Sequence, residues 1–401
     1  MKRRLIVSAC AALAAALSAM PSHAAQTTLV VDDNGAQCPG AGFTSIQAAV
    51  NAAIPGSTIR VCPGTYNEVV TVNKANLQLV GPRTPADCTQ PGAPNPATDA
   101  IVQADNAAGG VVNLVENGIR FQRFTVQNNT LGPGVFTGAS FSGHGVQQNL
   151  VQNNVLGVYF NSDGATDSTV TRNCIRQNNQ AGAASGNGIY SDLGLSDADI
   201  VQNAFFDNDS SALVLTGGAP GAVDAVDIDT NTSQQDGSLL AVFNSTDTRV
   251  RGNTVRNGTG SAIFVGNDNT ALQILSNNIT GSGRGVRTSI DFGGGPSSNV
   301  RITSNVISGS TSTDGISVGP NSLTGSFISS NLAFNNPRDG IRVDAGGNAG
   351  NQITGNVLRN NAEHDCHDDT VGAGTAGTAN TWRSNAGLTE NRPGLCRGTP
   401  S

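Results

Sequence analysis

One asparagine returns along this chain at intervals of 22 to 30 residues, each time inside the same short pattern. The repeated positions are Asn149, Asn173, Asn203, Asn231, Asn253, Asn277, Asn305, Asn331 and Asn356. An apolar residue usually stands three positions before the asparagine and another two positions after it. Such short apolar segments, broken by Asn, Gly, Ser and Asp and lacking a helical period, predict short strands stacked turn on turn in a solenoid.

The amide side chain gives a physical reason for the repeat. In a stacked coil each amide can donate to the asparagine of one neighbouring turn and accept from the other, which satisfies polar groups inside a narrow core. Asparagine also tolerates the left-handed backbone that a sharp bend between strands uses. In this pattern the chain resembles the right-handed parallel β-helix, or pectin-lyase-like, family, whose members carry such a ladder. The resemblance implies an all-β, right-handed parallel β-helix solenoid and fixes no reaction.

Composition agrees with this architecture. Glycine makes up 50 of 401 residues, and charged and aromatic residues only 13% and 4%, which favours strands and tight turns over helices. We expect one elongated unit with a signal peptide at 1–24, an N-terminal cap and first coils at 25–110, repeats at 111–361 and a C-terminal capping segment at 362–401. About a dozen turns at a spacing of ~4.8 Å would form a rod roughly 60 Å long.

The first residues have the features of an export signal. Lys2, Arg3 and Arg4 precede an Ala/Leu-rich run, and Ser22-His23-Ala24 offers small residues at a cleavage site. Cleavage would move the net charge from −7 to about −10, which argues against nucleic acid as a partner. No later segment is apolar and long enough for a transmembrane span. We therefore expect an exported protein, secreted or periplasmic.

Six cysteines follow the predicted signal peptide, and an even count in an exported chain favours disulfides. Pairs Cys38–Cys62 and Cys366–Cys396 are expected because each would staple an end of the coil. Cys88 and Cys174 are left over, and Cys174 is interpreted as a small apolar residue of a strand.

Both ends of the solenoid need covers. Ile46, Ala49, Val50 and Ala53 form the apolar stripe of a short capping helix that Ser45 would begin. Near the other end, Trp382 is expected to pack over the last coil. The segment 364–369 holds two His and three Asp residues, so it is either a closing loop or a metal site. Spacing does not separate these alternatives, and we name no metal ligand and no cofactor.

A second pattern locates the outer face of one strand per turn. A small residue and an apolar residue, as in Gly157-Val158, open the strand after the variable loop, and alternation turns the next side chain outward. The outward residues expected in this way are Tyr159, Tyr190, Phe264, Arg287, Ser317 and Arg342, with Arg284, Asp314 and Asp339 just before the glycines of three turns. The family resemblance implies that this sheet holds polysaccharide. Aromatic rings stack on sugars, and Arg and Asp bind hydroxyls or carboxylates. The alternative is a solvated face with chance content.

Two kinds of polysaccharide chemistry are open to this face. Hydrolysis would use Asp314 and Asp339 as paired carboxylates on adjacent turns. Elimination needs a base, often Arg or Lys, and a neutraliser of the sugar carboxylate, often Ca²⁺ held by Asp, and Arg287 and Arg342 with Asp314 and Asp339 are of these types. Tyr159, Tyr190, Phe264 and Arg284 are the substrate-binding candidates. Fragments around His144 and Arg301 resemble polygalacturonases but lack the accompanying carboxylates and lysine.

Whether the protein is an enzyme is left open. The expected function is binding, and processing if catalytic, of a polysaccharide or cell-surface glycan along the outer sheet. The alternative is a non-catalytic structural or adhesive protein of the cell surface, because no complete catalytic set is legible. The oligomeric state is not predicted.

Overall fold

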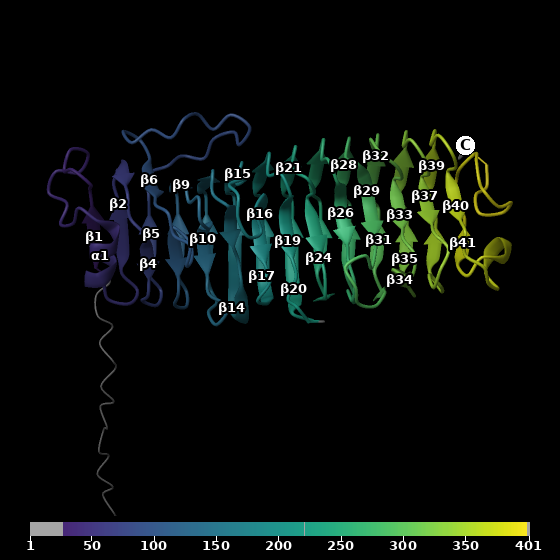
Figure 1. The fold of residues 1–401 in the computed structure, drawn as a ribbon, viewed down its shortest axis with the longest axis horizontal. Coiled ribbons are helices and arrows are strands. Elements are labelled where there is room, and N and C mark those ends of the chain that lie inside the picture. Colours follow the sequence, from purple (N-terminus) through teal and green to yellow (C-terminus); the bar gives the residue numbers. More distant parts are fainter. Residues whose placement is uncertain (1–26, 220, 399–401) are drawn as a thin grey trace, which may run out of the picture.

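The chain is wound into a rod of three parallel sheets (Figure 1). The structure is a computed structural model and describes residues 27–219 and 221–398. Along most of the rod each turn of the coil contributes one strand to each of sheets A, B and C, and every strand pairing is parallel. The all-β, right-handed parallel β-helix expected from the asparagine repeat is confirmed. The segment boundaries expected at residues 110 and 361 stay predictions. All three sheets have strands on both sides of residue 110.

The strands are short, most of them three to five residues. Sheet A contains β1 (Thr28–Val31), β2 (Thr58–Val61), β5 (Gln78–Val80), β8 (Arg120–Gln122), β11 (Gly145–Gln147), β14 (Ser162–Thr171), β17 (Leu195–Val201), β20 (Val223–Asp229), β23 (Ser245–Thr246), β24 (Arg249–Arg251), β27 (Gln273–Leu275), β31 (Arg301–Thr303), β35 (Phe327–Ser329), β38 (Gln352–Thr354) and β41 (Thr381–Arg383). Sheet B contains β3 (Gly64–Tyr66), β6 (Ala100–Gln103), β9 (Thr125–Gln127), β12 (Leu150–Gln152), β15 (Cys174–Arg176), β18 (Ala204–Phe206), β21 (Thr232–Gln234), β25 (Thr254–Arg256), β28 (Asn278–Thr280), β32 (Val306–Ser308), β36 (Leu332–Phe334) and β39 (Val357–Arg359). Sheet C contains β4 (Val70–Val72), β7 (Val112–Leu114), β10 (Pro133–Thr137), β13 (Leu156–Tyr159), β16 (Asn187–Ser191), β19 (Ser211–Leu215), β22 (Leu240–Val242), β26 (Ser261–Val265), β29 (Arg284–Thr288), β33 (Ile316–Val318), β37 (Ile341–Val343) and β40 (Cys366–Asp368). A separate pair joins β30 (Ser297–Ser298) to β34 (Leu323–Thr324).

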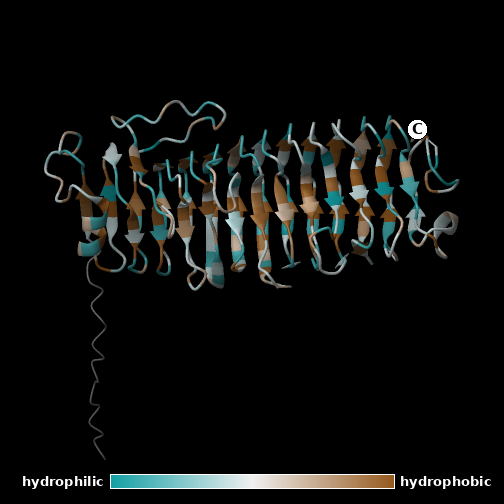
Figure 2. Cartoon of the chain, viewed as in Figure 1, coloured by the Kyte–Doolittle hydropathy of each residue, from teal (hydrophilic) through white to brown (hydrophobic). Residues whose placement is uncertain are grey.

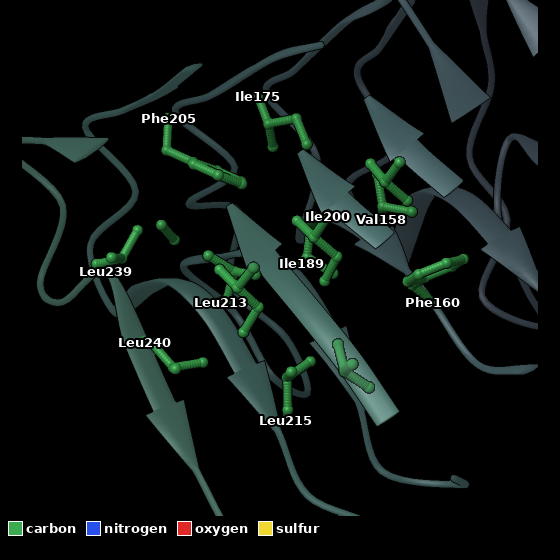
Figure 3. Packing of buried hydrophobic residues seen from close by; sticks show 14 of the residues in the cluster. Val158, Phe160, Ile175, Ile189, Ile200, Phe205, Leu213, Leu215, Leu239 and Leu240 are labelled. Carbon is green, nitrogen blue, oxygen red and sulfur yellow. The ribbon is translucent and has the colours of Figure 1, made fainter. Parts of the chain in front are cut away.

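Apolar side chains from all three sheets fill the inside of the coil. In sheet C, Val158, Ile189 and Leu213 lie in register on successive turns, and all three are fully buried. Ile175 and Phe205 of sheet B face them across the coil (Figure 3). Apolar and polar residues alternate along the strands (Figure 2), as a strand with one buried face requires.

The asparagine ladder lies at the bend between sheets A and B. Each side-chain Nδ2 donates to Oδ1 of the asparagine one turn later, as from Asn253 to Asn277 at 2.9 Å, and the column continues to Asn385. The predicted left-handed bend is present, but the preceding residue adopts it: φ is 56° at Arg172 and 53° at Ser276. The asparagine is therefore selected for its amide, since its neighbour carries the strained backbone.

A second ladder lies five residues further on, at the bend between sheets B and C. Asn154, Asn178 and Asn208 bond in sequence and end on Asp236, and each of these four side chains is buried. A shorter column between sheets C and A includes Asn269. Asn269 is fully buried and hydrogen-bonded to Ser245 and Ser297.

Covers close both ends of the rod. Helix α1 (Ile46–Ala52) begins at Ser45, as expected, and buries Ile46, Ala49 and Val50 against the first strands. The carboxylate of Glu68 accepts the N–H groups of Ile46 and Gln47, a cap that the local sequence did not reveal. Strand β3, which follows soon after this cap, begins sheet B.

At the C-terminal end the cover is built from the chain after β40. Trp382 lies in β41, in register with Ile353, and its Nε1 donates to Asp368 Oδ2 at 2.7 Å. A short 3₁₀ helix, η1 (Thr375–Gly377), precedes β41. Trp382 is 4% exposed and so belongs to the core as well as covering it.

Three disulfides tie the described chain. The expected bonds Cys38–Cys62 and Cys366–Cys396 are present. The interpretation of Cys174 as an unpaired apolar residue is wrong, because it is bonded to Cys88, 86 residues earlier. This bond anchors the long loop at 81–99, which arches over the rod (Figure 1). The predicted signal peptide lies outside the described residues, and among those described no helix has the length and apolarity to cross a membrane.

Candidate functional site

One outward-facing line of side chains runs along sheet C from β10 to β40. We call it the sheet C row. Its members, in strand register, are Phe136, Tyr159, Tyr190, Val214, Ala241, Phe264, Arg287, Ser317, Arg342 and His367. Successive members lie on adjacent strands, which are spaced by ~4.8 Å. The row is therefore a continuous strip that begins aromatic and ends charged.

The aromatic end is a cluster of three rings packed against one another. Phe136 and Tyr159 have ring centroids 5.3 Å apart, edge to face, and Tyr159 and Tyr190 have centroids 5.9 Å apart. The Tyr159 hydroxyl donates to the carboxylate of Asp192. Burial, together with the hydrogen bond to Asp192, raises the pKa of Tyr159 above its ordinary value, so the hydroxyl stays protonated at neutral pH. All three rings keep part of their surface in solvent.

A second aromatic group lies in the middle of the row. Phe264 packs against Phe243 and Phe292 with centroids 5.7 and 5.9 Å away, and Phe292 is 76% exposed. The Arg287 guanidinium lies 5.6 Å from the Phe264 ring centre and pairs with Asp291 at 2.6 Å. This part of the face therefore offers an exposed ring and a guanidinium that already has a carboxylate partner.

The charged end of the row is a tight network around Arg342. Its Nε donates to Asp344 Oδ1 at 2.6 Å, Nη1 to Asp339 Oδ2 at 3.2 Å and Nη2 to Asp369 Oδ2 at 3.0 Å. His367 sits between two of these carboxylates, with Nδ1 3.2 Å from Asp339 Oδ2 and Nε2 3.0 Å from Asp369 Oδ2. Arg342 is thus fully committed to carboxylates of the chain.

The pKa values of Asp314 and Asp339, the two carboxylates predicted to act as a pair, are shifted in opposite directions. Burial raises the pKa of Asp314. Burial also acts to raise the pKa of Asp339, but hydrogen bonds and charge from His367 and Arg342 outweigh it and hold the pKa below its ordinary value. For His367, burial lowers the pKa, and the hydrogen bonds and charges of Asp339 and Asp369 more than reverse this and raise it.

The predicted site residues are not equally available. Tyr159, Tyr190, Phe264, Arg287 and Arg342 lie on the row, and Arg284 begins strand β29 beside it with partial exposure. Asp314 and Asp339 are 2% and 0% exposed. Asp314 Oδ1 accepts the backbone N–H of Asp339, and Asp339 Oδ1 accepts that of His364. These two carboxylates therefore hold the loops and side chains around them in place and do not face a sugar bound on the outer surface.

Several residues of the face were missed. Phe136 follows Gly134-Val135, the same pattern that located Tyr159, and could have been found from it. His367 follows Cys366, which is in register with Ile341, but no glycine marks that turn. Phe292 lies in a loop, and no periodic signal points to it.

The polygalacturonase-like fragments are not on this face. His144 is 1% exposed beside sheet A, and burial lowers its pKa to about 4. Arg301 belongs to sheet A and stacks 4.7 Å from the Phe327 ring centre. Neither can act together with the sheet C row.

Three ligand atoms at the charged end meet the distances of a metal site. One atom each from Asp339, His364 and His367 lies within 4.8 Å of the others. His364 is partly exposed and its ring packs edge to face against that of His367, with centroids 5.0 Å apart.

Comparison with known proteins agrees with the fold. Residues 146–290 match the family model described as right handed beta helix region. A search of curated proteins found no match. The chain is a right-handed parallel β-helix protein.

Solved structures share this architecture at low sequence identity. The catalytic unit of a thermostable α-1,3-glucanase from Streptomyces thermodiastaticus strain HF3-3 is 15% identical with a TM-score of 0.56, over 94% of this chain and 71% of that one. The Dettilon tailspike protein is 13% identical with a TM-score of 0.57, over 80% of this chain and 63% of the tailspike. At these identities the likeness concerns the fold alone.

Proposed function

We propose that the protein binds a polysaccharide along the sheet C row. The observation that carries the proposal is the in-register cluster of Phe136, Tyr159 and Tyr190. Beyond Val214 and Ala241 a second aromatic group follows, in which Phe292 is exposed and Phe264 is only 9% exposed. Aromatic faces stack on sugar rings, and a hexose is roughly as long as one strand spacing, so a glycan laid along the rod would meet one turn per sugar. An α-1,3-glucanase with the same fold acts on a polysaccharide. This agrees with a polysaccharide as the class of ligand, but the proposal rests on the aromatic side chains.

The charges of the row favour a neutral polysaccharide over a polyuronate. Arg287 is paired with Asp291, and Arg342 is paired with Asp339, Asp344 and Asp369. An acidic sugar would have to displace one of these carboxylates and would meet the others at close range. This reverses the sequence-based expectation that Arg342 is free to bind a sugar carboxylate.

The test compares aromatic substitutions on two faces. Tyr190→Ala is expected to weaken glycan binding by roughly 1–3 kcal/mol, about 5- to 150-fold, by analogy with stacking on other aromatic platforms. Phe327→Ala removes an outward ring from sheet A and is expected to leave affinity unchanged. A glycan array followed by titration measures both. Absence of binding by the wild type, or equal loss in the two variants, would remove the proposal, and a preference for polyuronates would overturn the charge argument.

Processing of the bound glycan is a second candidate, favoured by the network at the end of the row. The side chains of His364 and Asp369 are 33% and 37% exposed, so these groups, in place of Asp314 and Asp339, would face a sugar. Incubation with neutral and uronate polysaccharides, assayed for reducing ends and unsaturated products, tests this. Binding without product supports the adhesive or structural alternative.

We also propose that the protein acts outside the cytoplasm, secreted or periplasmic. Three disulfides need an oxidising compartment to form and persist. Expression in a host with fractionation, and sequencing of the mature N-terminus near residue 25, tests this. Recovery of an uncleaved, reduced protein from the cytoplasm would contradict it.

A further inference from the structure

We propose that Asp339, His364 and His367 bind a divalent transition-metal cation, with Zn²⁺ the best match, at the C-terminal end of the sheet C row. His364 Nδ1 lies 3.3 Å from Asp339 Oδ1, and His367 Nδ1 lies 3.2 Å from Asp339 Oδ2. Ligand atoms bound tetrahedrally to Zn²⁺ at about 2.0–2.1 Å are roughly 3.3 Å apart. Each of these ring nitrogens therefore lies at about that spacing from one oxygen of the Asp339 carboxylate, and one ligand atom from each of the three residues lies within 4.8 Å of the others.

The donor set selects the kind of metal. Two imidazoles and one carboxylate suit Zn²⁺ and other first-row cations, whereas Ca²⁺ and Mg²⁺ prefer oxygen ligands throughout. Three protein ligands leave at least one position open, as in catalytic zinc sites. His364 lies partly in solvent, so the site has an entry path from the outer face.

A second carboxylate orients one of the ligands. His367 Nε2 is 3.0 Å from Asp369 Oδ2, the arrangement in which a metal-bound histidine donates its other N–H to a carboxylate. With that proton on Nε2, Nδ1 is the nitrogen left to coordinate, and it lies 3.2 Å from Asp339 Oδ2. Asp339 is itself oriented by the backbone N–H of His364, which donates to Oδ1 at 3.0 Å.

Arg342 contacts two of the three proposed ligands, and its Nη1 donates to Asp339 Oδ2 at 3.2 Å. Its Nη1 is 3.3 Å from both ring nitrogens of His367. Equal distances to both require Nη1 to lie over the ring face, since an in-plane approach would collide with the carbon between the nitrogens. Nη1 thus lies over the His367 ring. Three carboxylates, Asp339, Asp344 and Asp369, surround this one guanidinium and leave two negative charges for a divalent cation to neutralise.

Metal binding to the untagged full chain tests the site directly. After chelation and dialysis, titration with Zn²⁺ is expected to show one bound equivalent and a higher melting temperature. Co²⁺ is expected to give visible absorption bands of low coordination number, which purely oxygen-bound Co²⁺ at the surface would not show. His364→Ala removes the most exposed ligand and is expected to lower Zn²⁺ affinity at least tenfold.

A neighbouring carboxylate supplies the control. Glu363→Gln, next to His364 in sequence and paired with Arg338, is expected to leave Zn²⁺ affinity unchanged. Asp369→Asn is expected to weaken it by about 10- to 100-fold through the orientation of His367. Circular dichroism of the metal-free variants checks that each is folded.

Two outcomes would overturn the proposal: no saturable Zn²⁺ binding to the wild type, or equal affinity in wild type and a folded His364→Ala. Both are independent of glycan binding, because no sugar is present in the titration.

Discussion

At the scale of single residues, Asp236 is the exception in the second ladder. Its Oδ1 accepts two bonds from Asn208, and its Oδ2 accepts one from Ser233 at 2.7 Å. Burial raises its pKa to about 6 despite these hydrogen bonds. Because the folded state holds this proton more tightly than the unfolded state, stability falls as pH rises from about 4 through 6.

Asp236→Asn keeps the ladder oxygen and removes the buried charge. The variant is expected to gain on the order of 2–3 kcal/mol in free energy of unfolding at pH 7 to 8, and nothing below about pH 4. Urea unfolding across this pH range measures the difference. Asp247→Asn, an exposed carboxylate, is the control and should show no such trend. A pH-independent effect of Asp236→Asn would contradict the assignment.

Adjacent asparagines test the first ladder at the same scale. Asn277 accepts from Asn253 and donates to Asn305 and to the Val250 carbonyl, whereas Asn278 points outward from strand β28 and is exposed. Asn277→Leu strands buried amide groups on both sides and is expected to cost about 1–3 kcal/mol or more, while Asn278→Leu costs little. Thermal unfolding of the two variants decides, and equal small losses would argue against a stabilising ladder.

At the scale of elements, the loop at 81–99 acts as a strap across the outside of the coil. The Cys88–Cys174 bond holds it, and the buried Arg176 guanidinium donates to the carbonyls of Cys88 and Thr89. Replacing both cysteines by serine is expected to raise hydrogen exchange in the strap and in β15 and β18, with strands after β24 unaffected. Stability should drop by up to about 4 kcal/mol in the chain-entropy account. Unchanged exchange in the strap would mean that Arg176 suffices to hold it.

At the scale of the whole molecule, a rod of stacked turns has weaker ends, because an end turn has one neighbour where a middle turn has two. The single tryptophan, Trp382, lies in the last turn and reports on it. Under reducing conditions, which open Cys366–Cys396, Trp382 fluorescence is expected to change at lower urea than far-UV circular dichroism. In the oxidised protein the difference between the urea midpoints of fluorescence and circular dichroism should be smaller. Coincident reduced-state midpoints would show that the rod unfolds as one cooperative unit.

How much of the fold and of the candidate site could be predicted depends on how far along the chain each sequence pattern extends. Strand alternation depends on neighbouring residues, and the ladder repeats once per turn. Both can be read from the sequence, so they predict the stacked coil and place five outward residues on one line: Tyr159, Tyr190, Phe264, Arg287 and Arg342. The short ladder containing Asn269 escaped because loop lengths vary there, which hides a period. The left-handed backbone position was predicted one residue too late. Local propensity favours asparagine there, but the asparagine must keep its side chain inside to bond the amides of neighbouring turns, so the residue before it adopts the left-handed conformation.

The sequence by itself determined the parallel β-helix and the outward row, since both follow from periodic side-chain placement along the backbone. It also determined the stapled ends, because a pair of cysteines lies near each end of the coil. Only the tertiary structure decided that Cys88 meets Cys174, that Asp314 and Asp339 are buried, and that Arg342 is saturated by carboxylates from its own and the next turn. Those outcomes depend on where loops of unequal length bring residues far apart in the chain. A repeat encodes the stacking of turns, and it leaves open which loop side chains meet across them.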